Sequence, residues 1–187
     1  MSFYNDTESV KQYIKMCEGY DGSNIYQQLG HHLPQNSTLL ELGSGAGLDI
    51  DFLKKNYSVT GSDLSYEFLK ICRQQHPELS FVKLDALKLN LDEQFNCIYS
   101  NKVLHHLTED ELKQSLRQQL EILSPNGLIA HSFWLGEESK TMHDLLFTYY
   151  DKAHLLDIIS EFFDVLSTLS YEELSQDDSL FVIAKKP

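Results

Sequence analysis

Positive charge is scarce in this sequence of 187 residues. Lys and Arg number 15 against 28 Asp and Glu, which gives a net charge of −13. Most of such a surface would repel a polyanion, so we expect neither nucleic acid nor an anionic membrane as a partner. No run of about 18 apolar residues occurs, and no membrane-spanning helix is therefore expected.

Cysteine is also sparse, because it occurs at three separated positions and never as CxxC. This spacing supports neither a disulfide framework nor a zinc site, and we expect Cys17, Cys72 and Cys97 to be reduced and buried. The opening stretch, MSFYNDTESVKQYIK, contains no apolar segment of signal-peptide length. These observations predict a cytoplasmic protein without a bound metal.

Hydrophobic residues make up 42% of the chain, which is typical of a packed globule. The length fits a single domain over residues 1–187. Short apolar runs predict strands at residues 38–43, 57–63, 80–86, 95–101 and 127–134. Helical patterns occupy about residues 6–30, 47–56, 65–77, 108–123 and 135–160.

The clearest helix is TEDELKQSLRQQLEIL, residues 108–123. Thr108 and Glu111 form a capping box at its start. The leucines at positions 112, 116, 120 and 123 line one face of the helix, which indicates packing against the core.

Two apolar segments, residues 162–171 and 179–186, end the chain and are joined by the polar loop EELSQDD. No helix fits in so short a loop, so these two strands should be antiparallel. Five strands that alternate with helices, followed by this hairpin, predict an α/β fold with an open, doubly wound sheet. Ligands of such sheets bind beyond the carboxyl ends of the strands.

Three alternating glycines follow the first predicted strand, in ELGSGAGLDID. The loop lacks the lysine of a P-loop, and Leu48 stands where the dinucleotide fingerprint GxGxxG requires glycine. The three acids around the loop, Glu41, Asp49 and Asp51, would repel a pyrophosphate. A ligand with cationic groups and no phosphate suits this loop better.

Two further acids end the second and third predicted strands. Asp63 follows VTGS, and an ionised carboxylate at this point can accept both hydroxyl groups of a ribose. Asp85, in KLDAL, can accept a hydrogen bond from an adenine amino group. Dehydrogenases also carry an acid at the end of the second strand, so Asp63 alone does not decide which cofactor binds.

The ordered set of motifs resembles the class I S-adenosylmethionine-dependent methyltransferases, in particular the small single-domain enzymes of the type 11/12 group. ELGSGAG, VTGSDLS, FVKLDAL, FNCIYSNKVLHHL and LSPNGLIAHSFW are similar to five successive motifs of that family, and the resemblance covers about residues 37–186. It implies a Rossmann-like, seven-stranded sheet in the order 3-2-1-4-5-7-6, with strand 7 antiparallel. We expect residues 37–187 to form the core. Residues 1–36 include few apolar residues to tie them down, so we expect a helical cap or lid there, with a helix packed permanently on the sheet edge as the alternative.

The resemblance implies a set of contacts to S-adenosyl-L-methionine. The backbone of Gly43, Ser44, Gly45 and Gly47 would pass against the methionine part, with Glu41 nearby. Glycine would leave room for that part and allow positive φ. Asp63 would hold the ribose hydroxyl groups, and Leu64, Asp85 and Ala86 would contact the adenine. Asn101 would line the site near the transferred methyl group, and Tyr20 would fold over the cofactor.

The acceptor is less well defined. The resemblance implies methyl transfer by in-line displacement, which needs no dedicated nucleophile, and no catalytic residue is assigned. His105 and His106 are candidates for the acceptor site and one of them for a base, although packing at a helix start is the competing role. Trp134, at the end of the fifth strand, is a third candidate.

We expect a small-molecule acceptor, because no basic stripe and no recognition domain is evident. Protein methylation, a non-catalytic module that binds S-adenosylmethionine, and a nicotinamide dehydrogenase are the alternatives. The sequence does not indicate an oligomeric state.

Overall fold

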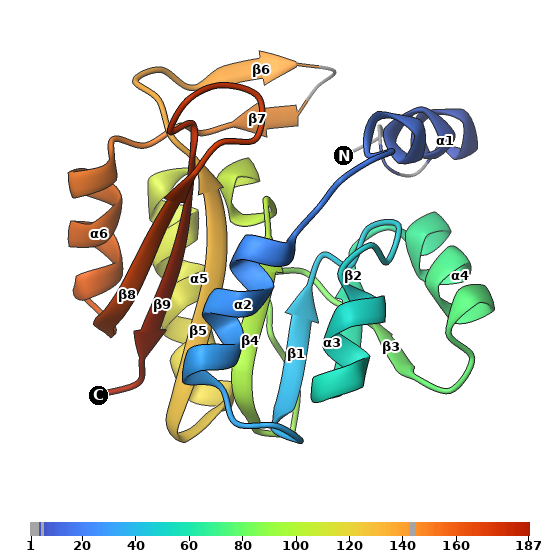
Figure 1. Ribbon diagram of the computed structural model, residues 1–187, viewed down its shortest axis with the longest axis horizontal. Coiled ribbons are helices and arrows are strands. Elements are labelled where there is room, and N and C mark those ends of the chain that lie inside the picture. Colours follow the sequence, from blue (N-terminus) through green and yellow to red (C-terminus); the bar gives the residue numbers. More distant parts are fainter. Residues whose placement is uncertain (1–3, 5, 143–144) are drawn as a thin grey trace.

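Figure 1 shows the chain as a computed structural model, which describes residue 4 and residues 6–142 and 145–187. Within these residues seven strands form one sheet in the order β3-β2-β1-β4-β5-β9-β8. The strands of this sheet are β1 Thr38–Leu42, β2 Ser58–Asp63, β3 Ser80–Lys83, β4 Phe95–Asn101, β5 Leu123–Trp134, β8 Asp164–Tyr171 and β9 Ser179–Lys185. The helices are α1 Thr7–Met16, α2 Ser23–His32, α3 Ile50–Asn56, α4 Tyr66–Gln75, η2 Leu104–His106, α5 Glu109–Ile122 and α6 Lys152–Ser160.

The strand directions confirm the order predicted for the sheet. β1 pairs in parallel with β2 and β4, β2 with β3, and β4 with β5. β9 is antiparallel to both of its neighbours, β5 and β8. Residues 172–178 are too few to cross the sheet. The chain must therefore turn back after β8, and β9 lies beside it as the second strand of a hairpin. The carboxyl ends of the five parallel strands therefore share one edge.

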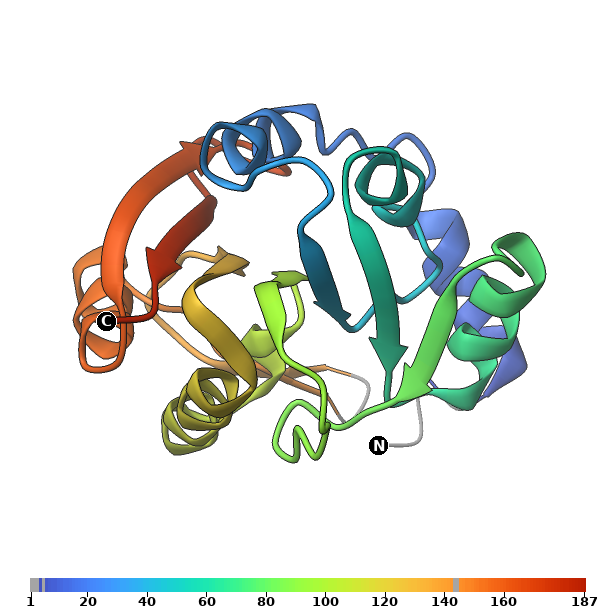
Figure 2. The same cartoon turned by 90° about the horizontal axis from the view of Figure 1, so that it is seen from below.

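Each face of the sheet carries its own apolar cluster. On one face, α2, α3 and α4 pack on the sheet through Ile25, Leu29, Ile50, Leu53 and Leu69. On the other face, α5 and α6 pack through Leu112, Leu116, Leu155, Ile158 and Ile159. Figure 2 shows helices on both sides of the twisted sheet, as a doubly wound fold requires.

The local signals that start the helices act as predicted. The Ser65 side chain accepts a hydrogen bond from the backbone N–H of Phe68 at 3.3 Å and caps α4. Thr108 and Glu111 form both halves of a capping box at the start of α5. Such a cap is worth about 1 kcal/mol, so each fixes the place where its helix begins. Of the three cysteines, Cys72 and Cys97 are buried as expected, whereas Cys17 is only half-buried.

The prediction of a helix throughout residues 135–160 is wrong in its first part. A short antiparallel hairpin stands there, formed by β6 Lys140–Met142 and β7 Leu145–Phe147, and only α6 is helical. Backbone groups that a helix would pair internally find distant partners. The N–H of Thr148 donates to the carbonyl of His105 at 2.7 Å, and that of Gly136 to the carbonyl of Tyr150 at 3.1 Å. Tertiary contacts thus override the helical pattern.

The connection between β3 and β4, residues 84–94, also carries no helix, unlike the other connections between parallel strands. Side chains of α5 hold it instead. Gln118 accepts a hydrogen bond from the N–H of Leu89 at 2.6 Å and donates one to the carbonyl of Leu87 at 2.7 Å. The segment that follows β3 is therefore fixed by α5 rather than by a helix of its own.

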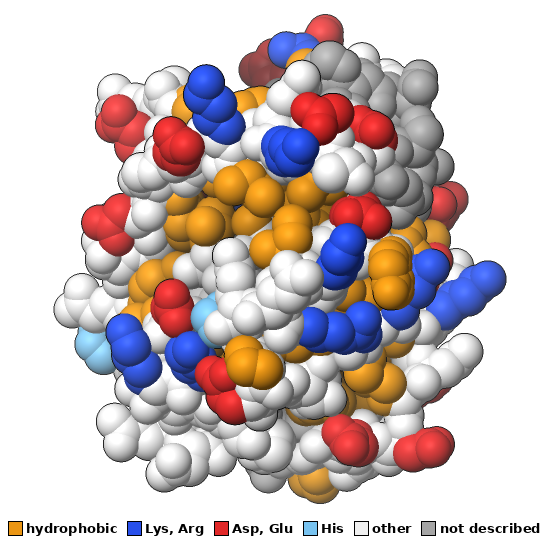
Figure 3. All heavy atoms as spheres, turned by 90° about the vertical axis from the view of Figure 1, so that its right-hand side faces the viewer, with side chains coloured by type: hydrophobic (Ala, Val, Ile, Leu, Met, Phe, Trp, Pro, Cys, Tyr) orange, Lys and Arg blue, Asp and Glu red, His pale blue; other side chains and the backbone are white. Residues whose placement is uncertain are grey.

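Two elements lie beyond the carboxyl ends of the parallel strands, namely α1 and the β6–β7 hairpin (Figure 1). Val10 is the one buried residue of α1. On the side of the molecule where α1 and α4 lie, hydrophobic side chains gather in a band between charged rims (Figure 3). Met16 of α1 and Tyr66 of α4 are both exposed. In contrast to α2, α1 is thus held by few apolar contacts.

Candidate active site

The glycine loop turns sharply after β1. Gly43, Gly45 and Gly47 have φ angles of 71°, 50° and 80°, in the left-handed region that side chains rarely adopt. The prediction that this turn needs positive φ is confirmed. At Gly43 a neighbouring side chain also excludes larger residues, because a Cβ atom there would lie 2.6 Å from Cγ2 of Val103. That glycine leaves room for the cofactor stays a prediction.

Asp63 ties this loop to the end of β2. One carboxylate oxygen accepts the N–H of Gly45 at 2.9 Å, and the other accepts the N–H of Ser65 at 2.7 Å. Burial raises the pKa of Asp63, and the two backbone donors oppose that rise. The sequence placed Asp63 and the loop at one sheet edge, but it did not indicate that they bond to each other.

Asn101, the last residue of β4, joins a partly buried polar network. Its side-chain amide donates to the hydroxyl of Tyr20 at 2.6 Å and to the carboxylate of Asp49 at 3.1 Å. The hydroxyl of Tyr26 donates to the other oxygen of Asp49. Two of these residues, Asn101 and Tyr20, were predicted for the site. Asp49 and Tyr26 were not, although Asp49 was noted among the acids near the glycines.

Glu41 is the third acid at the loop, with Asp49 and Asp63, whereas Asp51 pairs with Lys54. It is 2% exposed, and among the described residues its Oε2 atom has no hydrogen-bond partner. Burial raises the pKa of Glu41, and the negative charges of Asp49 and Asp63 raise it further. A buried, unpaired carboxylate oxygen is costly, and a cationic ligand group would satisfy it.

The residues predicted to contact adenine lie at the neighbouring strand ends. The carbonyl of Asp63 accepts the N–H of Leu84 at 3.1 Å, which joins the segment after β3 to the end of β2. Asp85 accepts the N–H of Leu87 at 2.9 Å, and Leu64 and Ala86 are half-buried. The edge thus presents a carboxylate and partly exposed apolar surface.

His105 and His106 form η2, directly beyond β4. Burial lowers the pKa of both, so both are neutral near pH 7. His106 Nδ1 lies 2.7 Å from the carbonyl oxygen of Leu146. Because a carbonyl can only accept, Nδ1 carries the proton and Nε2 is left as an acceptor. His105 stacks on Phe147, with ring centroids 5.3 Å apart.

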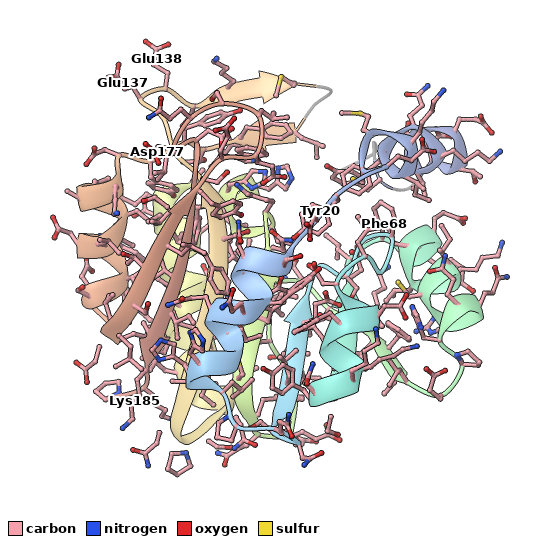
Figure 4. The ribbon with its side chains drawn as sticks, viewed as in Figure 1. Tyr20, Phe68, Glu137, Glu138, Asp177 and Lys185 are labelled. Atoms are coloured by element: carbon pink, nitrogen blue, oxygen red, sulfur yellow. The ribbon has the colours of Figure 1, made fainter. Side chains whose placement is uncertain are left out.

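Aromatic residues of the N-terminal segment cover the glycine loop. A ring carbon of Tyr13 lies 3.7 Å from the place where a Cβ of Gly45 would stand. Tyr4 and Tyr13 both contact Phe68, and the ring of Tyr4 also lies 6.1 Å from that of His106. Figure 4 shows Tyr20 and Phe68 on the same side of the sheet, near its carboxyl edge. The predictions named Tyr20 but missed Tyr4 and Tyr13, which precede the motifs.

Trp134, the last residue of β5, faces a lysine that the sequence analysis overlooked. The Nζ atom of Lys102 lies 3.5 Å from the centroid of the Trp134 ring and 5.2 Å from that of Tyr171. The adjacent Asn101 instead contacts Tyr20 and Asp49, so the two neighbours direct their side chains to different groups. Ser132 connects them, because its hydroxyl donates to Asn101 at 2.5 Å and accepts the N–H of Lys102 at 2.9 Å.

Sequence comparison supplies the family. Residues 39–127 match a family described as a methyltransferase domain, and this range runs from β1 to the start of β5. The chain is an S-adenosylmethionine-dependent methyltransferase. Its methyl donor is S-adenosylmethionine, which this family uses. The resemblance identified from the motifs is thus confirmed.

Two curated relatives and one solved structure illustrate its similarity to known proteins. It is 27% identical over 175 residues to an uncharacterized methyltransferase of Oceanobacillus iheyensis, covering 89% of this chain and 79% of that protein. It is 31% identical over 111 residues to an Arabidopsis thaliana tRNA (carboxymethyluridine(34)-5-O)-methyltransferase, covering 58% of this chain but 27% of that protein.

The solved structure is 1,6-didemethyltoxoflavin-N1-methyltransferase of Burkholderia thailandensis, with 1,6-didemethyltoxoflavin and S-adenosylhomocysteine bound. Its TM-score to this methyltransferase is 0.79 at 19% identity, covering 96% of this chain and 86% of that one. This likeness concerns the fold.

The described residues also bear on two other kinds of partner, metal ions and membranes. No group of three or more His, Cys, Asp or Glu side chains there is placed to hold a metal ion. None of the helices in that part of the chain combines the length and hydropathy that a membrane crossing requires.

Proposed function

We propose that this methyltransferase modifies a small-molecule acceptor at the carboxyl ends of β1, β2 and β4. S-adenosylmethionine supplies a methyl group already activated on a sulfonium. The residues of the chain then have to bind the donor, align the acceptor and exclude water. The cytoplasmic location predicted from the sequence remains part of this proposal.

The unpartnered Oε2 atom of Glu41 is the observation that carries the assignment of the site. We assign Glu41 and the loop from Gly43 through Ser44 to Gly47 to the methionine part, whose ammonium would satisfy this oxygen. The buried charge of Asp49 adds to the attraction for cationic groups.

We assign the remaining contacts to the cofactor to residues at or just beyond the carboxyl ends of the strands. We assign Asp63 to the ribose, because each of its carboxylate oxygens keeps a lone pair after accepting one backbone N–H. We assign Leu64, Asp85 and Ala86 to the adenine, and Asn101 with Tyr20 to the side of the transferred methyl group. The network of Asn101 with Asp49 holds this amide in one orientation.

The cover above the site favours a small acceptor. α1 and the β6–β7 hairpin both lie beyond the strand ends, where an acceptor would enter (Figure 1). The net charge of −13 opposes binding of a polyanion. A tRNA acceptor is the second candidate, supported by the similarity to the tRNA methyltransferase over 58% of the chain.

Two measurements test this proposal. Calorimetric titration should give binding of S-adenosylhomocysteine and none of NAD or ATP. Transfer of a labelled methyl group from S-adenosylmethionine into a metabolite extract should then exceed transfer into total tRNA or protein. Labelling of tRNA or protein with none of the extract would refute the small-molecule acceptor, and binding of NAD alone would refute the site assignment.

A further inference from the structure

The Lys102 side chain is buried at the acceptor side of the site, next to Asn101. Its Nζ atom donates to the hydroxyl of Ser179 at 2.6 Å and to the carbonyl of Phe133 at 3.2 Å. Its third partner is the carboxylate of Glu173, at 3.3 Å. The side chain of Lys102 is 11% exposed. An ammonium group is thus held between two aromatic rings and three acceptors.

Lys102 is energetically unfavourable in two ways, through its buried charge and through its backbone conformation. Burial disfavours the charged ammonium and lowers the pKa of Lys102 to about 8, although Glu173 opposes the shift. The backbone of Lys102 also has φ of 55°, which is unfavourable for a residue with a side chain. Costs of this kind persist mainly where function requires them, and here they fall at the end of the central strand, beside the predicted methyl position.

The partners of Lys102 differ in how firmly they are held. Phe133 and Ser179 belong to the paired strands β5 and β9. Glu173 lies in the loop 172–178, and its side chain is 26% exposed. This loop is folded on Asp178, whose carboxylate accepts the N–H groups of residues 173, 174 and 175. Glu173 is therefore the partner that a ligand can replace with the least disturbance.

We infer that the acceptor carries a carboxylate, which takes the place of Glu173 on Lys102 while a flat part of the acceptor lies against Trp134 and Tyr171. This inference rests on the proposed small-molecule function and narrows its substrate class. Glu173 then acts as an internal substitute for the acceptor carboxylate. The competing role is a permanent clamp, in which Lys102 only anchors the loop between β8 and β9.

Benzoate is a suitable probe, because it offers one carboxylate on one aromatic ring. Its binding is measured by calorimetry to protein loaded with S-adenosylhomocysteine, at about pH 6.5, where Lys102 is protonated. The proteins are the wild type, Glu173→Gln, and Glu173→Gln combined with Lys102→Met. Benzamide, neutral and of the same shape, is the matched control ligand.

Benzoate should bind Glu173→Gln at least about tenfold more tightly than the wild type, because the internal carboxylate no longer competes. The double variant should lose this gain, and benzamide should bind all three proteins equally weakly. Affinity of Glu173→Gln for benzoate should also fall as the pH rises through the pKa of Lys102, which loss of the Glu173 carboxylate shifts below its wild-type position. A clamp has no reason to produce this pH profile.

Equal benzoate binding to the wild type and Glu173→Gln would overturn the inference, as would binding that survives Lys102→Met. If the double variant fails to bind S-adenosylhomocysteine, the comparison of benzoate with benzamide on Glu173→Gln and its pH profile still decide. Because benzoate binding needs no methyl transfer, this test can fail while the proposed function stands. A wild type that does not bind S-adenosylhomocysteine would instead refute the proposed function itself.

Discussion

Substitution of Asp63 should change two properties of the protein that can be measured separately. In the protein without cofactor, its carboxylate accepts the N–H of Gly45 at 2.9 Å and the N–H of Ser65 at 2.7 Å. In the complex, we propose that it also binds the ribose. Asp63→Ala should therefore weaken both folding and cofactor binding.

The loss of stability follows from the two backbone donors. A hydrogen bond to a charged group is worth about 1.5–3 kcal/mol, and a buried donor left without a partner adds to the cost. Burial also disfavours the charge of Asp63, as its raised pKa indicates, which reduces the net gain. We expect Asp63→Ala to lose about 2–4 kcal/mol of the free energy of unfolding. Asp63→Asn, which keeps one carbonyl oxygen as acceptor, should lose about half as much.

Urea unfolding without ligand measures the first effect, and calorimetry with S-adenosylhomocysteine measures the second. Loss of the ribose contacts should weaken binding by about 2–4 kcal/mol, or about 30- to 700-fold. Asp85→Asn is the matched control, because among the described residues the Asp85 carboxylate accepts only the N–H of Leu87. This substitution should cost less than about 1 kcal/mol in stability. An Asp63→Ala protein that unfolds at the wild-type urea concentration would refute the role in the loop. Wild-type affinity would refute the ribose contact.

Three other predictions concern the same edge of the sheet. Binding of S-adenosylmethionine should release protons near neutral pH, because a cationic ligand lowers the raised pKa of Glu41. Calorimetry in buffers of different ionisation heat should show this release, and Glu41→Gln should abolish it. Affinity should accordingly increase with pH above the ordinary glutamate pKa. Gly43→Ala should lower the melting temperature by several degrees, through its φ of 71° and the contact with Val103, and Val103→Ala should recover part of the loss. Amide exchange in residues 8–16 should slow when S-adenosylhomocysteine binds if α1 is a lid, whereas equal protection in both states would make α1 a fixed element.

Most elements and the glycine loop were predictable because their signals are local, whereas the order of the strands came from the resemblance to a known family. An apolar run that ends in glycine, or a capping box such as Thr108 and Glu111, specifies its element within a few residues of sequence. Asp63 was found for the same reason, since it ends a strand at a known distance from the loop. Its two backbone hydrogen bonds could not be predicted, because they depend on how β1 and β2 pair.

The residues that sequence reasoning missed depend on contacts between distant segments. Lys102 follows a recognised motif, but only the fold brings Trp134, Tyr171 and Glu173 around it. Tyr13 meets the glycine loop from a helix that precedes every motif. The β6–β7 hairpin was mistaken for helix because the spacing of its apolar residues suited one, while its backbone partners lie elsewhere in the chain.

The left-handed glycines also limit which mutations the gene can accept. Every glycine codon begins with two guanines, so single base changes yield Ala, Val, Ser, Cys, Trp, Arg, Asp or Glu. Of these, Asp alone adopts positive φ with some ease. At Gly45 an aspartate would add a fourth acid beside Glu41, Asp49 and Asp63. Natural substitutions should therefore be rare in this turn even where the sequences of the surrounding helices vary. Random mutagenesis libraries should likewise contain few active clones with a substitution there.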